Sequence, residues 1–180
     1  MNIKSVFVLN KIIPVILFQK FNSEISLLVR VKNLLTSLVT LKKSILYQFT
    51  LLTAISGVDY YNNKYRFNVT YELLSLVYNT RVRLKVFLTE IDSVPSIVEV
   101  FKNANWWERE IWDLYGIFFS NHPDLRRILT DYGFEGYPMR KDFPVYGYVE
   151  VFYDSIQKRI LIESLELSQE YRVFSFDTPW

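Results

Sequence analysis

Ionisable side chains are concentrated in residues 105–144, which read NWWEREIWDLYGIFFSNHPDLRRILTDYGFEGYPMRKDFP. Glu108, Glu110 and Asp113 could act as general acids and bases or bind a hard cation. At about 100° per residue of a helix, however, Glu108 lies about 160° around the axis from Glu110, so the three carboxylates do not converge. Arg109 stands one helical turn before Asp113 and can pair with it. Salt bridges and helix capping therefore explain this pattern better than catalysis or metal binding.

His122 is the only histidine, and the sequence contains no cysteine. An imidazole can act as an acid, a base or a redox-linked proton carrier. No nucleophile stands at a recognisable spacing from His122, so a structural role in a loop is the better interpretation. Thiolate iron–sulfur ligation and the common Cys/His zinc sites are excluded. Glycine-rich phosphate loops and nucleophile elbows are missing as well. We expect no catalytic residue, cofactor or metal in this chain.

Basic side chains of the same segment alternate with acidic ones. Planar arginine groups interleaved with carboxylates are typical of protein–protein ion pairs, whereas nucleic-acid binding needs a continuous basic surface. Large rings are the side chains that most often anchor such contacts. We expect the partner contacts to include Trp106, Glu108, Arg109, Glu110, Trp112, Asp113, His122, Arg126, Arg127, Asp131, Tyr132, Phe134, Arg140 and Asp142.

The first half of the chain predicts a sheet with helices. Alternation of apolar and polar residues predicts strands with one polar face, which favours an antiparallel sheet covered by helices on a single side. The expected fold class is therefore α+β. The predicted elements are a short helix over Asn2–Leu17, strands over Glu24–Val31, Leu46–Val58, Tyr65–Leu76 and Arg81–Leu88, and a helix over Asn33–Lys43.

The second half predicts less regular structure. A short helix is expected from Val94 to Phe101, and a second helix that begins at Asn105 and ends before Gly116. Asn105 and Glu108 have the spacing of a capping box. After Gly116 the periodicity stops, and the next element expected is a strand over residues 145–153.

Aromatic residues suggest how the chain divides. Residues 106–180 hold 18 of the 31 aromatic residues, yet they show no second core pattern. We expect an α+β domain over residues 1–103, and a signature helix with an extended, partly irregular arm over residues 104–180. Such an arm needs a partner to offset the entropy of its ordering.

Charge and hydropathy place further bounds on function. Residues 1–58 carry seven basic side chains and one acidic, and the remainder carries 14 basic and 18 acidic. The early basic residues are spread singly and suit a solvated face. No apolar run reaches the roughly 20 residues that a membrane helix needs. The N-terminus has neither a signal-peptide cleavage site nor an arginine-rich presequence, so we expect an organelle-encoded or bacterial protein.

Three stretches resemble the thirty-kilodalton subunit of respiratory complex I, which is called subunit nine where mitochondria encode it and which also occurs in bacteria. They are ANWWEREIWDLYGIFF at 104–119, HPDLRRILTDYGFEG at 122–136 and RKDFP at 140–144. The likeness continues through GYVEVFYD at 147–154 and, in pattern, through residues 58–86. Tyr137 stands where many relatives have histidine, and Trp107 where smaller or aliphatic residues are usual.

The resemblance implies a cofactor-free core subunit of the hydrophilic arm of NADH:ubiquinone oxidoreductase, packed on the forty-nine-kilodalton subunit and neighbouring iron–sulfur subunits. FMN, iron–sulfur clusters and ubiquinone belong to the assembled complex. The implied location is the matrix side of the mitochondrial inner membrane, or the cytoplasmic face in a bacterium, with membrane association only through the complex. Alternatives are the equivalent subunit of the plastid NDH complex or of a membrane-bound hydrogenase, and an independent enzyme or nucleic-acid binder.

Overall fold

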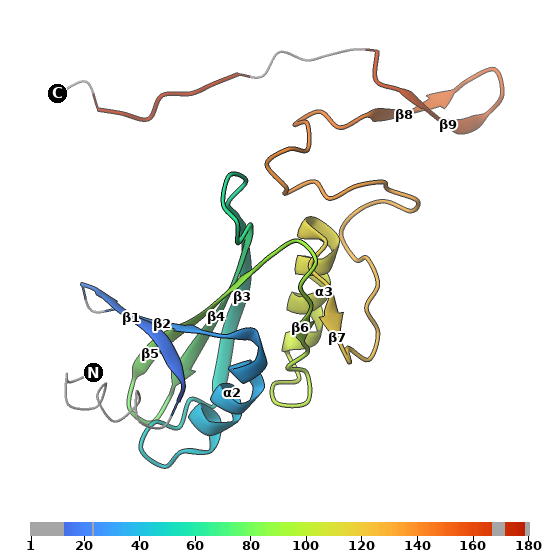
Figure 1. The fold of residues 1–180 in the computed structure, drawn as a ribbon. Helices are drawn as coiled ribbons and strands as arrows, with labels where there is room; N and C mark the ends of the chain where they lie inside the picture. Colours follow the sequence, from blue (N-terminus) through green and yellow to red (C-terminus); the bar gives the residue numbers. More distant parts are fainter. Residues whose placement is uncertain (1–12, 23, 167–171, 179–180) are drawn as a thin grey trace.

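A five-stranded sheet forms the centre of the computed structural model, which describes residues 13–22, 24–166 and 172–178 (Figure 1). The strands follow the order β1-β2-β5-β4-β3, and of the neighbouring pairs only β2 and β5 run parallel. This arrangement confirms the predicted α+β class with a mostly antiparallel sheet. The strands are β1 (Val15–Phe21), β2 (Glu24–Val29), β3 (Leu51–Asp59), β4 (Phe67–Ser75) and β5 (Thr80–Leu88).

Alternating side chains fix which face of the sheet is buried. Val69 pairs with Val86 and Tyr71 with Leu84, and all four side chains are fully buried. A register shift of one residue would turn this whole set toward water, so the pattern specifies the pairing. Tyr65 was expected on the same face, but it precedes β4 and is exposed.

Two helices cover this inner face. In α2 (Leu34–Lys43), Leu34, Leu38 and Leu41 point into the core, as the helical spacing predicts. The second helix, α3 (Ala104–Tyr115), lies against β3. A Cβ atom on Gly57 would lie 2.9 Å from the Tyr115 ring, so this close approach requires glycine.

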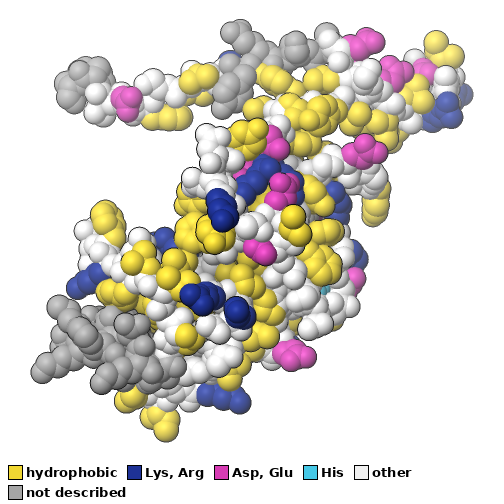
Figure 2. All heavy atoms as spheres, in the orientation of Figure 1, with side chains coloured by type: hydrophobic (Ala, Val, Ile, Leu, Met, Phe, Trp, Pro, Cys, Tyr) yellow, Lys and Arg dark blue, Asp and Glu magenta, His cyan; other side chains and the backbone are white. Residues whose placement is uncertain are grey.

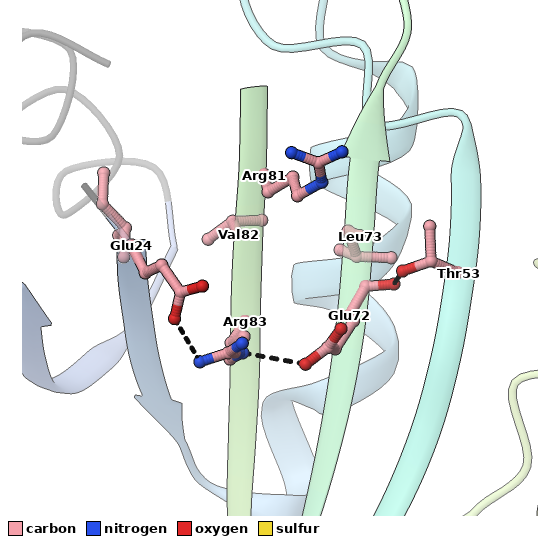
Figure 3. A pocket seen from close by; sticks show the side chains of 8 residues that line it. Glu24, Thr53, Glu72, Leu73, Arg81, Val82 and Arg83 are labelled. Atoms are coloured by element: carbon pink, nitrogen blue, oxygen red, sulfur yellow. Dashed lines mark hydrogen bonds and ion pairs between the residues drawn. The ribbon is translucent and has the colours of Figure 1, made fainter. Parts of the chain in front are cut away.

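The outer face of the sheet carries charged side chains, and no helix among the described residues lies on it (Figure 3). Arg83, on the central strand, bonds through Nε to Glu72 at 2.8 Å and through Nη1 to Glu24 at 2.5 Å. These side chains are more than a third exposed, so each pair contributes only about 0–1 kcal/mol. Helices on one side and a solvated polar face on the other agree with the sequence-based expectation.

Two predicted helices are wrong where the structure describes them. Residues 1–12 lie outside the described part, and Val15–Leu17 belong to β1, which pairs with β2. Residues 94–101 do not form a helix, because β6 (Val94–Pro95) pairs with the distant β7 (Phe119–Ser120). Only a turn follows, closed by the Phe101 N–H to the Ile97 carbonyl.

The C-terminal strands form a separate hairpin beyond α3 (Figure 1). Strands β8 (Val149–Asp154) and β9 (Arg159–Ser164) pair only with each other among the described residues. Ile111, Ile117 and Phe119 all belong to the core of the sheet domain. The arm therefore contributes to this core at its start, and the division at residue 104 remains a prediction.

Candidate partner interface

Carboxylates of α3 point into the domain. Glu108 and Asp113 are fully buried, and Arg109 is 5% exposed. The capping box is wrong, because the helix begins at Ala104 and its N-cap, Asn103, makes no side-chain capping bond. The expected Arg109–Asp113 pair is also wrong, since Asp113 pairs with Arg127 instead.

Glu108 joins the helix to the segment after β6. Its Oε1 accepts the Ile97 N–H and its Oε2 accepts the Ser96 hydroxyl, both at 2.7 Å. Burial raises the pKa of Glu108 from 4.5 to about 7, although both hydrogen bonds favour the charged form. The carboxyl is therefore partly protonated near neutral pH.

His122 lies beside this carboxyl, with its side chain also fully buried. Its Nδ1 accepts the Asp124 N–H at 3.1 Å, so the ring proton sits on Nε2, 3.3 Å from the Asn105 carbonyl. Nε2 is 3.7 Å from Glu108 Oε2. Burial lowers the pKa of His122, with a further lowering by Arg109. A neutral imidazole held on both nitrogens fits the expected structural role.

Asp113 organises the loop that follows β7. Its Oδ2 accepts the backbone N–H groups of Ile128, Leu129 and Thr130 at 3.1, 2.7 and 2.9 Å. Its Oδ1 accepts the Thr130 hydroxyl at 2.6 Å and Arg127 Nη1 at 3.2 Å. Burial acts to raise the pKa of Asp113, but these bonds outweigh it and leave the pKa lowered.

A second set of charges holds the root of the arm on the domain. Asp59 is buried at the end of β3, where it accepts Arg66 Nε at 2.9 Å and the Lys141 N–H at 2.9 Å. Arg66 also bonds to Asp142 at 2.6 Å. Arg140 donates to the Tyr115 carbonyl at 2.7 Å and to Glu90 at 2.6 Å. Sequence reasoning found Arg140 and Asp142 but missed their partners, because pairs up to 76 residues apart leave no local pattern.

Other predicted contact residues lie nearer the surface. Trp106 is 68% exposed with Arg109 over its ring, and Tyr132 is 100% exposed. Trp112 packs on Phe118 and Tyr137. Phe134 packs on Phe143, and Glu110 is half-buried. Arg126 donates a hydrogen bond to Asp124, and Asp131 accepts the Tyr132 N–H. The contact roles remain predictions, and the printed bonds of Glu108 join it to Ser96 and Ile97 within this chain.

Exposed apolar side chains line the C-terminal hairpin and the described part of the tail (Figure 2). Val151 is 54% exposed and Ile162 is 63% exposed. A Phe174–Phe176 pair follows, with both rings mostly exposed. Large contiguous apolar patches on a folded chain typically mark protein contacts. A small α+β domain that carries such an arm is typical of a subunit of a larger assembly.

Comparison with known proteins specifies the family. Residues 27–149 match the model of the family described as respiratory-chain NADH dehydrogenase, 30 Kd subunit, and the chain belongs to this family. The resemblance stated from the signature segment is thereby confirmed.

Similar proteins come from eukaryotes and bacteria. The NADH-ubiquinone oxidoreductase subunit 9 of Reclinomonas americana is 54% identical over 87% of this chain and 77% of its own length. A subunit of the NADH-quinone oxidoreductase of Methylobacterium radiotolerans is 52% identical over 87% and 73%. A relative from Beta trigyna, 56% identical over 74% and 69%, is called iron-sulfur protein 3. This chain supplies no thiolate to a cluster, because it contains no cysteine.

A solved structure shares the fold. One chain of the membrane-bound sulfane sulfur reductase, an archaeal respiratory membrane complex, aligns with a TM-score of 0.68 and 21% identity over 78% of this chain and 84% of that one. Within the described ranges, no helix is long and apolar enough to span a bilayer. The same residues contain no group of three or more His, Asp or Glu side chains that could hold a metal.

Proposed function

We propose that this chain is a structural core subunit of NADH:ubiquinone oxidoreductase that holds the subunits around the quinone site in register. Electron transfer from NADH to ubiquinone would use FMN and iron–sulfur clusters of other subunits. The partners would be the forty-nine-kilodalton subunit and the neighbouring iron–sulfur subunits. The location would be the matrix side of the mitochondrial inner membrane, or the cytoplasmic face in a bacterium.

Family membership and the exposed hairpin together support this proposal. The root of the arm is held by Asp59, Arg66 and Arg140, whereas Val151 and Ile162 lie opposite each other and face outward. A rigid domain that presents an unpartnered apolar strand pair suits a role in assembly. The observation that carries the proposal is this exposed face on a chain of the 30 Kd family.

Serine at the exposed pair tests the proposal in the assembled complex. The Val151→Ser/Ile162→Ser double variant should lower the amount of assembled complex on native gels. Activity per assembled complex should stay unchanged, because the chain contributes no reacting group. The matched control is Val77→Ser/Ile91→Ser, an exposed valine and isoleucine in turns of the domain. Full assembly combined with a selective loss of quinone reduction would contradict a structural role.

A further inference from the structure

The two faces of the β8–β9 hairpin differ in chemistry. Side chains alternate between the faces of a strand, and cross-strand partners share a face. One face is apolar except for Ser164, which stands opposite Val149 at its end, and its apolar members are 53–68% exposed. This face contains Val149, Val151, Tyr153, Ile160 and Ile162. The other face has Phe152 opposite Leu161 at its centre, with charged pairs on either side.

Those charged pairs are not equivalent. Asp154 stands opposite Arg159, which is a favourable pairing of opposite charges. At the other end, Glu150 stands opposite Glu163. Neither glutamate forms an ion pair with any described residue. Like charges directly opposite each other, with Cβ atoms about 5 Å apart, destabilise a strand pair.

This repulsion falls on an element with little stability of its own. A two-stranded hairpin alone in water is marginally stable at best. The apolar face of this one is open, and the face that carries the glutamates is only partly covered, since Phe152 is 43% exposed and Leu161 is half-buried. The hairpin therefore lacks a cover on its apolar face and a positive charge beside the two glutamates on the other face.

We infer that the hairpin inserts between two surfaces of a partner protein, one apolar and one carrying an arginine or lysine that binds Glu150 and Glu163 together. This rests on the proposed function and adds the chemistry of the partner. An arginine fork can bond two carboxylate oxygens at once. A second copy of this hairpin would bring the same two carboxylates, and an anionic lipid surface would repel them. The partner is thus a different protein with a basic side chain beside an apolar patch.

Charge reversal at residue 163 separates this inference from its alternatives, because the expected sign differs between the free chain and the complex. In the free chain, Glu163→Lys creates an attractive pair with Glu150 and should slow amide exchange in β8 and β9 roughly two- to fivefold. In the complex, the new lysine meets the partner's cation, and incorporation in competition with the wild-type chain should fall roughly tenfold or more. The incorporation of Glu163→Gln should lie between those of the wild-type chain and Glu163→Lys. Glu99→Lys, at an exposed glutamate of the domain, is the matched control.

Each outcome bears on one claim. Incorporation of Glu163→Lys at or above the wild-type level would overturn the inferred cation. If Val151→Ser/Ile162→Ser incorporates poorly in the same experiment, the proposed function still stands. Normal incorporation of both variants would overturn docking of the hairpin altogether. Self-association of the free chain, or its binding to phosphatidylserine vesicles, abolished by the serine variant, would assign the apolar face to another occupant and overturn the inference.

Discussion

The α3 helix and the β8–β9 hairpin use carboxylates in opposite ways. In α3, Asp113 meets five donors inside the protein. In the hairpin, Glu150 faces Glu163, and apolar side chains remain in water. Carboxylates thus find their hydrogen-bond donors within the chain in one region and lack them in the other. Where a chain satisfies its buried polar groups, it folds alone; where it does not, the missing groups describe the partner.

Removal of the Asp113 carboxylate should have the largest effect on the self-sufficient region. Asp113→Ala removes the acceptor shared by three backbone N–H groups, the Thr130 hydroxyl and Arg127, which should lower the free energy of unfolding by about 3–5 kcal/mol. Urea denaturation of the full chain, followed by tryptophan fluorescence, measures it. The control is Asp131→Ala at an exposed loop position, expected within about 0.5 kcal/mol of wild type. Equal losses of unfolding free energy in both variants would mean that the Asp113 hydrogen bonds do not stabilise the fold.

Glu108 should make the stability of the same region depend on pH. The folded state raises the pKa of Glu108 from 4.5 to about 7, so it binds more protons than the unfolded chain between these values. The contribution of Glu108 is therefore complete below pH 4.5 and declines as the pH rises to 7, by about 3 kcal/mol. His122 acts in the opposite direction, because its pKa is lowered and stability falls as the pH drops below 6.5.

Glutamine at position 108 isolates the first effect. Glu108→Gln mimics the protonated carboxyl: its carbonyl can accept the Ile97 N–H and its amide can donate to Ser96. The difference in unfolding free energy, variant minus wild type, should rise by about 3 kcal/mol between about pH 4.5 and pH 8. Only the part of the His122 contribution that is independent of Glu108 cancels in this difference, because the two side chains lie 3.7 Å apart. Glu99→Gln serves as the exposed control, and a difference for Glu108→Gln that stays flat with pH would refute the buried protonated carboxyl.

Sequence reasoning predicted the elements that depend on local pattern. Strands β4 and β5 were placed within two residues at each end, because strict alternation survives in a sheet with one buried face. The helix over Leu34–Lys43 followed from its leucine spacing in the same way. Local rules failed where distant groups compete for the backbone. Residues 94–95 extend because β7 supplies their hydrogen bonds, and Glu108 binds Ile97 instead of capping its own helix.

The candidate contact surface was predictable only in part. The segment that carries Trp106, Tyr132 and Arg140 was singled out by its composition. Composition does not show which way a side chain points, however: Glu108, Asp113 and His122 were expected among the partner contacts, and their side chains are buried within this chain. No local sequence pattern around Glu150 predicts that Glu163 lies opposite it in a hairpin.

Tyr132 gives the smallest expected effect on the free chain and the sharpest contrast with Asp113. Its side chain is 100% exposed, so Tyr132→Ala should change the free energy of unfolding by less than about 0.5 kcal/mol. If the ring anchors a partner subunit, the same change should weaken association by about 2 kcal/mol, or roughly thirtyfold. Competition between tagged variant and wild-type chains for incorporation into the complex measures this loss. Tyr61→Ala, in an exposed turn of the domain, is the control. Incorporation of Tyr132→Ala equal to that control would remove residue 132 from the interface.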